Sequence, residues 1–247
     1  MHRPRALAVL PAAVLLAVPA GAGAAPRAGV ELVSCTPALD PVARSAAFEG
    51  RMRAIRRSAR MQMRFTLQSR APGGDWKRVA APGWQAWLTA QPGVGRYAYV
   101  RTVQNLPVPA RYRTVVRFRW LDGKGRRLAR RLAVSPACRQ PDLRPDLEPR
   151  RLEVLRAPGQ PKLRRYIVWT GNAGLTAAGP FTVVLRLPGQ PELVTPVAGL
   201  VPDAREFITF TAPACTPGEP LAAAVDAGAT VDERDEEDNL LAAPCPD

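Results

Sequence analysis

The chain has 247 residues, including 27 prolines and 19 glycines, and its 35 Lys and Arg exceed its 21 Asp and Glu to give a formal net charge of +14. Its one histidine is His2, and it contains neither a CxxC pair nor a GxxxxGK[ST] phosphate loop. No histidine is present after residue 2, which excludes catalysis by a histidine-activated nucleophile in the rest of the chain. The missing motifs exclude CxxC-type zinc sites and P-loop nucleotide binding. We therefore expect a protein with no enzymatic activity, no cofactor and no metal ion.

The first 24 residues have the layout of a secretory signal peptide. Arg3 and Arg5 precede an apolar run at residues 7–18, and Ala22-Gly23-Ala24 offers a small-residue cleavage site. An uncleaved anchor is the alternative, but the run is shorter than the roughly 20 residues of a spanning helix and contains Pro11. We predict cleavage after Ala24 and a secreted mature chain without a transmembrane segment.

Four cysteines lie in the predicted mature chain, and an even number in an exported protein indicates disulfides. They are Cys35, Cys138, Cys215 and Cys245, for which three pairings are possible. Cys35 and Cys138 bracket one block of the chain, and Cys215 and Cys245 lie inside another. We predict these two bridges, one in each block.

The charge also divides the chain into two blocks. Residues 25–140 carry 23 Lys and Arg against 5 Asp and Glu, whereas residues 141–247 carry 10 against 16. Between them, residues 138–151 are rich in proline and charge and have no apolar period, which favours a stiff linker. We predict a basic domain at residues 25–140 and a second domain at residues 141–247.

The basic block has the alternation of β-strands. Apolar and polar residues alternate strictly over residues 60–68, and a similar pattern covers residues 112–120 and 126–134. The turn sequence LDGKG joins the last two segments into a hairpin. A three-residue loop, Asp122–Lys124, would pair Phe118 with Leu128 and Arg119 with Arg127, whereas a two-residue loop would oppose Phe118 to an arginine. Since the apolar faces must match, we predict the three-residue loop with a bulge.

This hairpin predicts an exposed arginine face. Such a face attracts polyanions through phosphate or sulfate contacts and counterion release. Teichoic acids, acidic polysaccharides, extracellular DNA or an acidic domain of the same kind would fit it. Alternatively, the arginines only solubilise the surface, and opposite charges hold the two domains together. No aromatic residue alternates with these arginines on the exposed parity, which argues against base stacking and sequence-specific recognition of nucleic acid. The candidate polyanion-binding residues are Arg113, Arg117, Arg119, Arg127 and Arg131.

The second block contains five short apolar runs punctuated by Gly, Pro and Asn, which is the spacing of a β-sandwich. Its motifs occur in a recognisable order: Asn-x-Gly after a strand, Phe-x-Val, an Asp closing a strand, and then Val-x-Glu-x-x-Glu with a nearby Asn. In this order the block resembles the CARDB family, the bacterial cell-adhesion-related domain. The resemblance implies an immunoglobulin-like or fibronectin-like sandwich that serves as an accessory module without enzymatic activity. The matching residues are Asn172, Gly174, Asp226, Glu233, Glu236 and Asn239.

The stretch VDERDEEDNL at residues 231–240 carries six acidic side chains, and calcium prefers such oxygen ligands. The stretch lacks the glycine and spacing of an EF-hand, however, and neighbouring carboxylates on an extended strand point to opposite faces. Asp and Asn also suit turns. We predict a solvated turn leading to the last strand, and no metal site.

Together these features predict an all-β protein of two tandem immunoglobulin-like or fibronectin-like sandwiches after a signal peptide. The predicted function is an exported adhesion or protein-interaction module of a bacterial surface. The alternative is a protein that binds a polyanion or the cell envelope through its basic domain. The partner, a protein or an envelope polymer, is not specified by the sequence.

Overall fold

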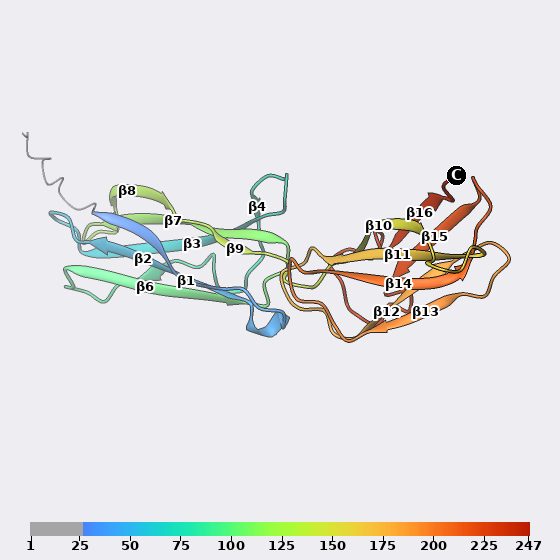
Figure 1. Cartoon of the computed structure of the whole chain (residues 1–247). Helices are drawn as coiled ribbons and strands as arrows, with labels where there is room; N and C mark the ends of the chain where they lie inside the picture. The colour runs from blue at the N-terminus through green and yellow to red at the C-terminus, as the bar shows by residue number, and fades with distance from the viewer. Residues whose placement is uncertain (1–26) are drawn as a thin grey trace, which may run out of the picture.

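The computed structural model describes residues 27–247, so the predicted signal peptide lies outside the described residues. Within this range the chain is all-β, apart from a single 3₁₀ turn at Pro41–Ala43 (η1). Four antiparallel sheets form two sandwiches that lie end to end (Figure 1). The predicted fold class is confirmed. Among residues 27–247, no helix is long and apolar enough to cross a membrane.

The N-terminal sandwich contains two sheets of different size. The smaller has the order β1 (Ala28–Thr36), β2 (Ser45–Arg53) and β6 (Arg96–Gln104). The larger has the order β4 (Lys77–Arg78), β3 (Arg60–Arg70), β7 (Ala110–Leu121) and β8 (Arg127–Val134), with β5 (Leu88–Thr89) paired to β3 and β9 (Cys138–Gln140) paired to β7.

The alternation predicted for the two central strands, β3 and β7, determines which side chains form the core of this sandwich. On β3, Met61, Met63, Phe65 and Leu67 are buried, and on β7 the even-numbered residues 112–120 are buried in the same layer. Burying such side chains is worth roughly 1.5–3 kcal/mol each, so this face drives folding. The odd-numbered residues of β7 consequently lie on the outer face of the larger sheet.

The predicted register of the β7–β8 hairpin is wrong. Phe118 is opposite Arg131 and Arg119 is opposite Arg130, because the turn lies one residue later than predicted and Leu128 is an extra residue in a bulge. Asp122 fixes this turn, since its carboxylate accepts hydrogen bonds from the backbone N–H of Lys124 and of Arg126 at 2.9 and 2.8 Å. Two alanines of β8 therefore pack toward the core, whereas Leu128, which the predicted pairing with Phe118 places there, is exposed together with Leu132 and Val134.

The C-terminal sandwich has its own core, which no residue of the N-terminal core joins. Tyr166, Val183, Leu185 and Leu221 are among its most buried side chains. One sheet has the order β10 (Leu147–Arg156), β11 (Leu163–Asn172) and β14 (Arg205–Pro213). The other has the order β13 (Leu193–Val197), β12 (Phe181–Arg186), β15 (Pro220–Val225) and β16 (Leu240–Pro244).

Each sandwich contains one disulfide, and the pairs are those that the sequence predicts. Cys35 of β1 is bonded to Cys138 of β9, and Cys215 is bonded to Cys245 after β16. The connection between the sandwiches is shorter than the predicted linker, because β9 ends at residue 140 and β10 begins at residue 147. Only residues 141–146, between β9 and β10, connect the two sandwiches.

Candidate binding face of the N-terminal sandwich

The outer face of the larger N-terminal sheet carries ten arginines from four strands. Register places them in cross-strand rows, because residues opposite each other on antiparallel strands share a face. Arg64 is opposite Arg117, Arg119 is opposite Arg130, and Arg111 lies between Arg70 and Arg139. We call this surface the arginine face; it comprises Arg60, Arg64, Arg70, Arg111, Arg113, Arg117, Arg119, Arg127, Arg130 and Arg139.

Two tryptophans from the segment between β3 and β6 lie on this face. The guanidinium carbon of Arg119 is 3.8 Å from the ring centroid of Trp87, and that of Arg64 is 4.9 Å from it. Similarly, Arg113 is 4.0 Å and Arg70 is 5.0 Å from the ring centroid of Trp76. Each ring thus holds two cations, an interaction worth about 0.5–2 kcal/mol per cation depending on solvent exposure.

A glutamine of β3 completes each arrangement. Gln62 Oε1 accepts a hydrogen bond from Arg119 Nε at 2.6 Å, and Gln68 Oε1 accepts one from Arg113 Nε at 2.9 Å. Because only the Nε donor is used in each case, the terminal Nη groups stay available to an anion. The face therefore contains two equivalent units, Gln62–Arg119–Trp87 and Gln68–Arg113–Trp76.

No acidic side chain compensates the arginine face within residues 27–247. None of its ten arginines takes part in any of the ion pairs of this range. All of these pairs also join two residues on the same side of residue 140, so no ion pair there connects the basic block to the acidic one. A smaller attraction does cross this boundary, because the charge of Arg44 contributes to lowering the pKa of Asp142. Like charges placed opposite each other are destabilising, so the bare face is under electrostatic repulsion.

The sequence located part of this face. Arg113, Arg117, Arg119 and Arg127 lie on it as expected. The altered register gives Arg131 the opposite parity and places Arg130 on the face. Arg131 is nevertheless exposed at the edge of the sheet, where it lines a depression of this face. As predicted, no aromatic residue alternates with the arginines on the outer parity of β7 and β8. Two tryptophans nevertheless lie on the face, because they come from segments with no strand periodicity.

One part of the face is hollowed into an open depression of about 680 Å³. Its lining includes Trp87 and six arginines: Arg64, Arg117, Arg119, Arg127, Arg130 and Arg131. A concave surface with six cations and no acid attracts a negatively charged group more strongly than a flat one, because the field is focused there.

The family-motif residues of the C-terminal sandwich form a different kind of cluster, which is structural. Asn172 is 1% exposed and satisfies its whole side chain: Oδ1 accepts from the N–H of Asp146 and of Gly174, and Nδ2 donates to the carbonyls of Thr176 and Leu200. Gly174 must be glycine, because a Cβ there would lie 2.5 Å from the carbonyl oxygen of Arg144.

The acidic stretch belongs to the same cluster and is not the fully solvated turn that was predicted. Glu233 is 1% exposed; its carboxylate accepts hydrogen bonds from the N–H of Leu147 and from Asn239 Nδ2, while its own N–H donates to Glu236 Oε1 at 3.0 Å. Burial, with a smaller contribution from the charge of Glu236, raises the pKa of Glu233 to about 7. Asp226 closes the preceding loop by accepting from the N–H of Val231 at 2.8 Å.

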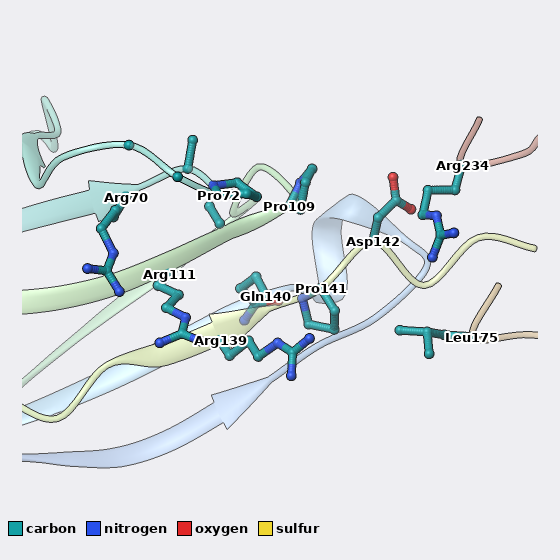
Figure 2. Close-up of a pocket in the computed structure, with 14 residues that line it drawn as sticks. Arg70, Pro72, Pro109, Arg111, Arg139, Gln140, Pro141, Asp142, Leu175 and Arg234 are labelled. Carbon is teal, nitrogen blue, oxygen red and sulfur yellow. The ribbon is translucent and has the colours of Figure 1, made fainter. Parts of the chain in front are cut away.

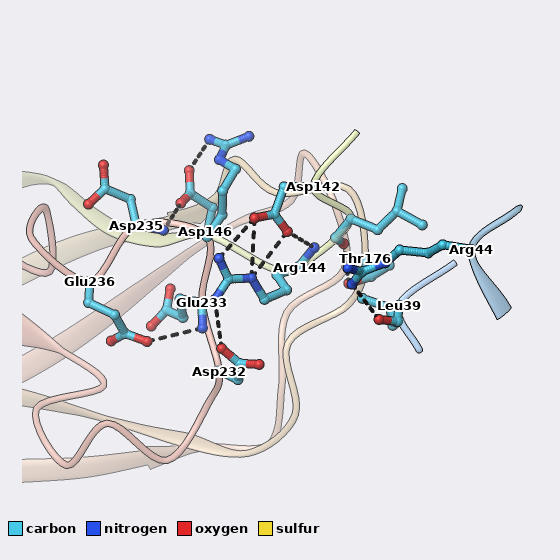
Figure 3. A network of polar contacts seen from close by, with 12 residues as sticks. Leu39, Arg44, Asp142, Arg144, Asp146, Thr176, Asp232, Glu233, Asp235 and Glu236 are labelled. Carbon is cyan, nitrogen blue, oxygen red and sulfur yellow. Dashed lines mark hydrogen bonds and ion pairs between the residues drawn. The ribbon is translucent and has the colours of Figure 1, made fainter. Parts of the chain in front are cut away.

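Arginines neutralise the acids at the rim of this cluster (Figure 3). Arg144 contacts Asp142 and Asp232 at 2.8 and 2.7 Å, and Arg234 pairs with Asp146. The Arg144 guanidinium lowers the pKa of the Asp142 carboxyl. Among residues 27–247 no group of three His, Cys, Asp or Glu side chains is arranged to hold a metal ion.

Comparison with known proteins identifies the C-terminal part of the chain. Residues 144–243 match the family model of CARDB, and this part of the chain is a CARDB domain. A CARDB domain structure from Pyrococcus furiosus in complex with di-metal ions is 24% identical over 40% of this chain and 84% of that one, with a TM-score of 0.33. No curated protein sequence matches the chain.

Two further solved structures are similar over most of the chain. Red sea bream transglutaminase is 12% identical over 89% of this chain and 31% of that enzyme, with a TM-score of 0.32. The class 5 fimbriae chaperone CfaA is 9% identical over 87% of this chain and 98% of the chaperone, with a TM-score of 0.27.

Proposed function

We propose that the protein is an exported, non-enzymatic adhesion module that attaches to an anionic polymer of the cell envelope through the arginine face. The CARDB domain suggests an adhesion-related extracellular module, and its family is one of non-catalytic modules. The observation that carries the choice of ligand is the set of ten arginines on one sheet face with no acidic partner among residues 27–247.

The spacing of the two units favours a linear ligand. They are six residues apart along both β3 and β7, which corresponds to about 20 Å. Two outward-facing rows lie between them, the charged row of Arg64 and Arg117 and the uncharged row of Thr66 and Val115. An extended polymer lying along the strands can contact both units at once, and linking two weak contacts raises the overall affinity without any new interaction.

The tryptophans favour recognition of charge over recognition of rings. Since each indole already carries guanidinium groups at 3.8–5.0 Å, it is not free to stack on a base in the manner of single-strand-binding proteins. A guanidinium held flat by a ring and by a glutamine presents its remaining donors as a fork, which suits phosphate, sulfate or carboxylate oxygens. We therefore favour an acidic polysaccharide or polyol phosphate over nucleic acid.

The experiment is salt-gradient elution of the purified protein from a heparin-type polyanion column. The test variant replaces four arginines of the face by glutamine: Arg113, Arg117, Arg119 and Arg130. The matched control loses four exposed arginines of the same sandwich that lie off the face: Arg27, Arg53, Arg56 and Arg96. Both variants have the same net charge, so only the position of the charge differs.

We expect the face variant to elute at a much lower salt concentration than the control, because phosphate-type contacts release counterions and their loss reduces the salt dependence. An equal shift of the two variants would mean that only net charge is measured. The arginines would then be a solubility feature, and the search should turn to protein partners that bind exposed strand edges.

A further inference from the structure

The arginine face ends in a pocket where the two sandwiches meet (Figure 2). The pocket has a volume of about 620 Å³, within the range of small-molecule sites. The N-terminal sandwich contributes Arg70, Arg111 and Arg139, and the C-terminal side contributes Leu175 and Arg234. Both sandwiches therefore build the walls.

The three N-terminal arginines form one cross-strand row. Arg70 of β3 is opposite Arg111 of β7, which in turn is opposite Arg139 of β9. Their side chains consequently share one face, with neighbouring strands about 5 Å apart. None of the three makes an ion pair within residues 27–247.

The other charges in the pocket wall are already compensated. Asp142 accepts hydrogen bonds from Arg144 Nε and Nη2 at 3.1 and 2.8 Å, and Arg234 is paired with Asp146. The acid is thus not available to the row, which leaves three uncompensated positive charges. Three prolines, Pro72, Pro109 and Pro141, also line the pocket, and their fixed φ limits the backbone freedom of its walls.

We propose that this pocket binds a multiply charged oxyanion, a phosphate or sulfate group, held by Arg70, Arg111 and Arg139. Guanidinium groups bind such oxygens by paired donors, and three of them in a concave site match an anion of two or more charges. The anion is either the end group of the anionic polymer or part of a free small molecule. The first of these alternatives rests on the proposed function.

The test is isothermal titration of the full chain with inorganic pyrophosphate, a probe far shorter than the arginine face. Variants Arg111→Gln and Arg139→Gln each remove one member of the row. Arg96→Gln removes the same charge from an exposed arginine of the same sandwich that lies off the arginine face and outside the pocket. We expect the Kd to rise at least tenfold in each pocket variant and less than twofold in the control. The absence of saturable binding, or an equal loss in the control, would overturn the proposal.

A second titration separates the two sources and the two proposals. Pyrophosphate should bind the four-arginine face variant as tightly as it binds the original chain, because that variant leaves the row intact. If long-chain polyphosphate binds the original chain more tightly than pyrophosphate and loses this advantage in the face variant, the pocket receives a polymer end. If the two probes bind equally, the pocket takes a free small anion. Pyrophosphate binding without polyanion retention would reject the proposed function alone.

Discussion

The carboxylate of Glu233 accepts a hydrogen bond from the backbone N–H of Leu147, so the acidic loop before β16 closes onto the first residue of β10. The two residues are 86 positions apart. The sequence alone suggests that this carboxylate is a surface charge, but it is buried in the CARDB domain. Its protonation is therefore coupled to folding.

We predict that Glu233 makes the stability of the C-terminal sandwich depend on pH. Its pKa is raised from 4.5 to about 7 in the folded chain, so the folded state binds more protons than the unfolded state between these values. The contribution is fully present below about pH 4.5, is lost as pH rises toward 7, and is constant above that. The loss amounts to at most about 3 kcal/mol.

The measurement is urea unfolding at several pH values for the original chain and for Glu233→Gln. The difference in unfolding free energy between the two should change between pH 4.5 and 7 and be flat above pH 7. Parallel stability curves over this window would show that Glu233 titrates as an ordinary carboxyl.

We predict that Gly174→Ala strongly destabilises the C-terminal sandwich. The new Cβ would lie 2.5 Å from backbone atoms of Arg144 and Pro145, which cannot move away as a flexible side chain could. Backbone shifts of this kind cost roughly 1–3 kcal/mol or more. Gly179→Ala is the matched control, since a Cβ there meets no atom within 4 Å. Thermal unfolding should show a clear drop in Tm for the first variant alone; similar Tm values would refute the packing argument.

We predict that Trp87→Leu weakens polyanion retention although it changes no charge. Arg64 and Arg119 would lose the ring over which they lie, and their guanidinium groups would become less ordered. Trp169→Leu is the control, because this tryptophan packs against Phe207 in the other sandwich. The variant should elute from the polyanion column at lower salt than the control. Identical elution would leave charge alone as the basis of retention.

We predict that the two disulfides contribute unequally to stability. The Cys35–Cys138 bridge closes a separation of 103 residues and the Cys215–Cys245 bridge one of 30, and the chain-entropy model gives the longer loop the larger effect, about 4–5 against 3–4 kcal/mol. The double variants Cys35→Ala/Cys138→Ala and Cys215→Ala/Cys245→Ala should both lower the unfolding free energy of their own sandwich, the first by more. The reverse order in urea unfolding would reject the entropic ranking.

The sequence predicted well where one periodic pattern decides the structure. The strict alternation at residues 60–68 marked β3 and its buried face, and the motif order placed the CARDB domain in the C-terminal half. The sequence did not predict the core residues of β8, where small side chains rather than large ones face the core. On β8, Ala129 and Ala133 pack against the core while Leu132 is exposed, because the bulge at Leu128 shifts the strand and hydrophobicity alone does not predict the position of a bulge.

The tryptophans of the arginine face could not be predicted for a different reason. Trp76 and Trp87 lie beside strands of only two residues, Lys77–Arg78 and Leu88–Thr89, which have no period. Their position depends on contacts between segments far apart in the chain. The pairing of β3 with β7, which brings Gln62 opposite Arg119, is likewise a tertiary contact that neither strand encodes by itself.

Strand β7 contributes alternate residues to the core and to the arginine face: Phe118 and Trp120 lie in the core, whereas Arg117 and Arg119 lie on the face. Inserting or deleting one residue in the strand would exchange the two sets, because the side-chain period is two. Substitutions that alter the arginine face along this strand without disturbing the core are thus confined to odd-numbered positions. Changes in length, which loops tolerate freely, would here disrupt the hydrophobic core and the arginine face at the same time.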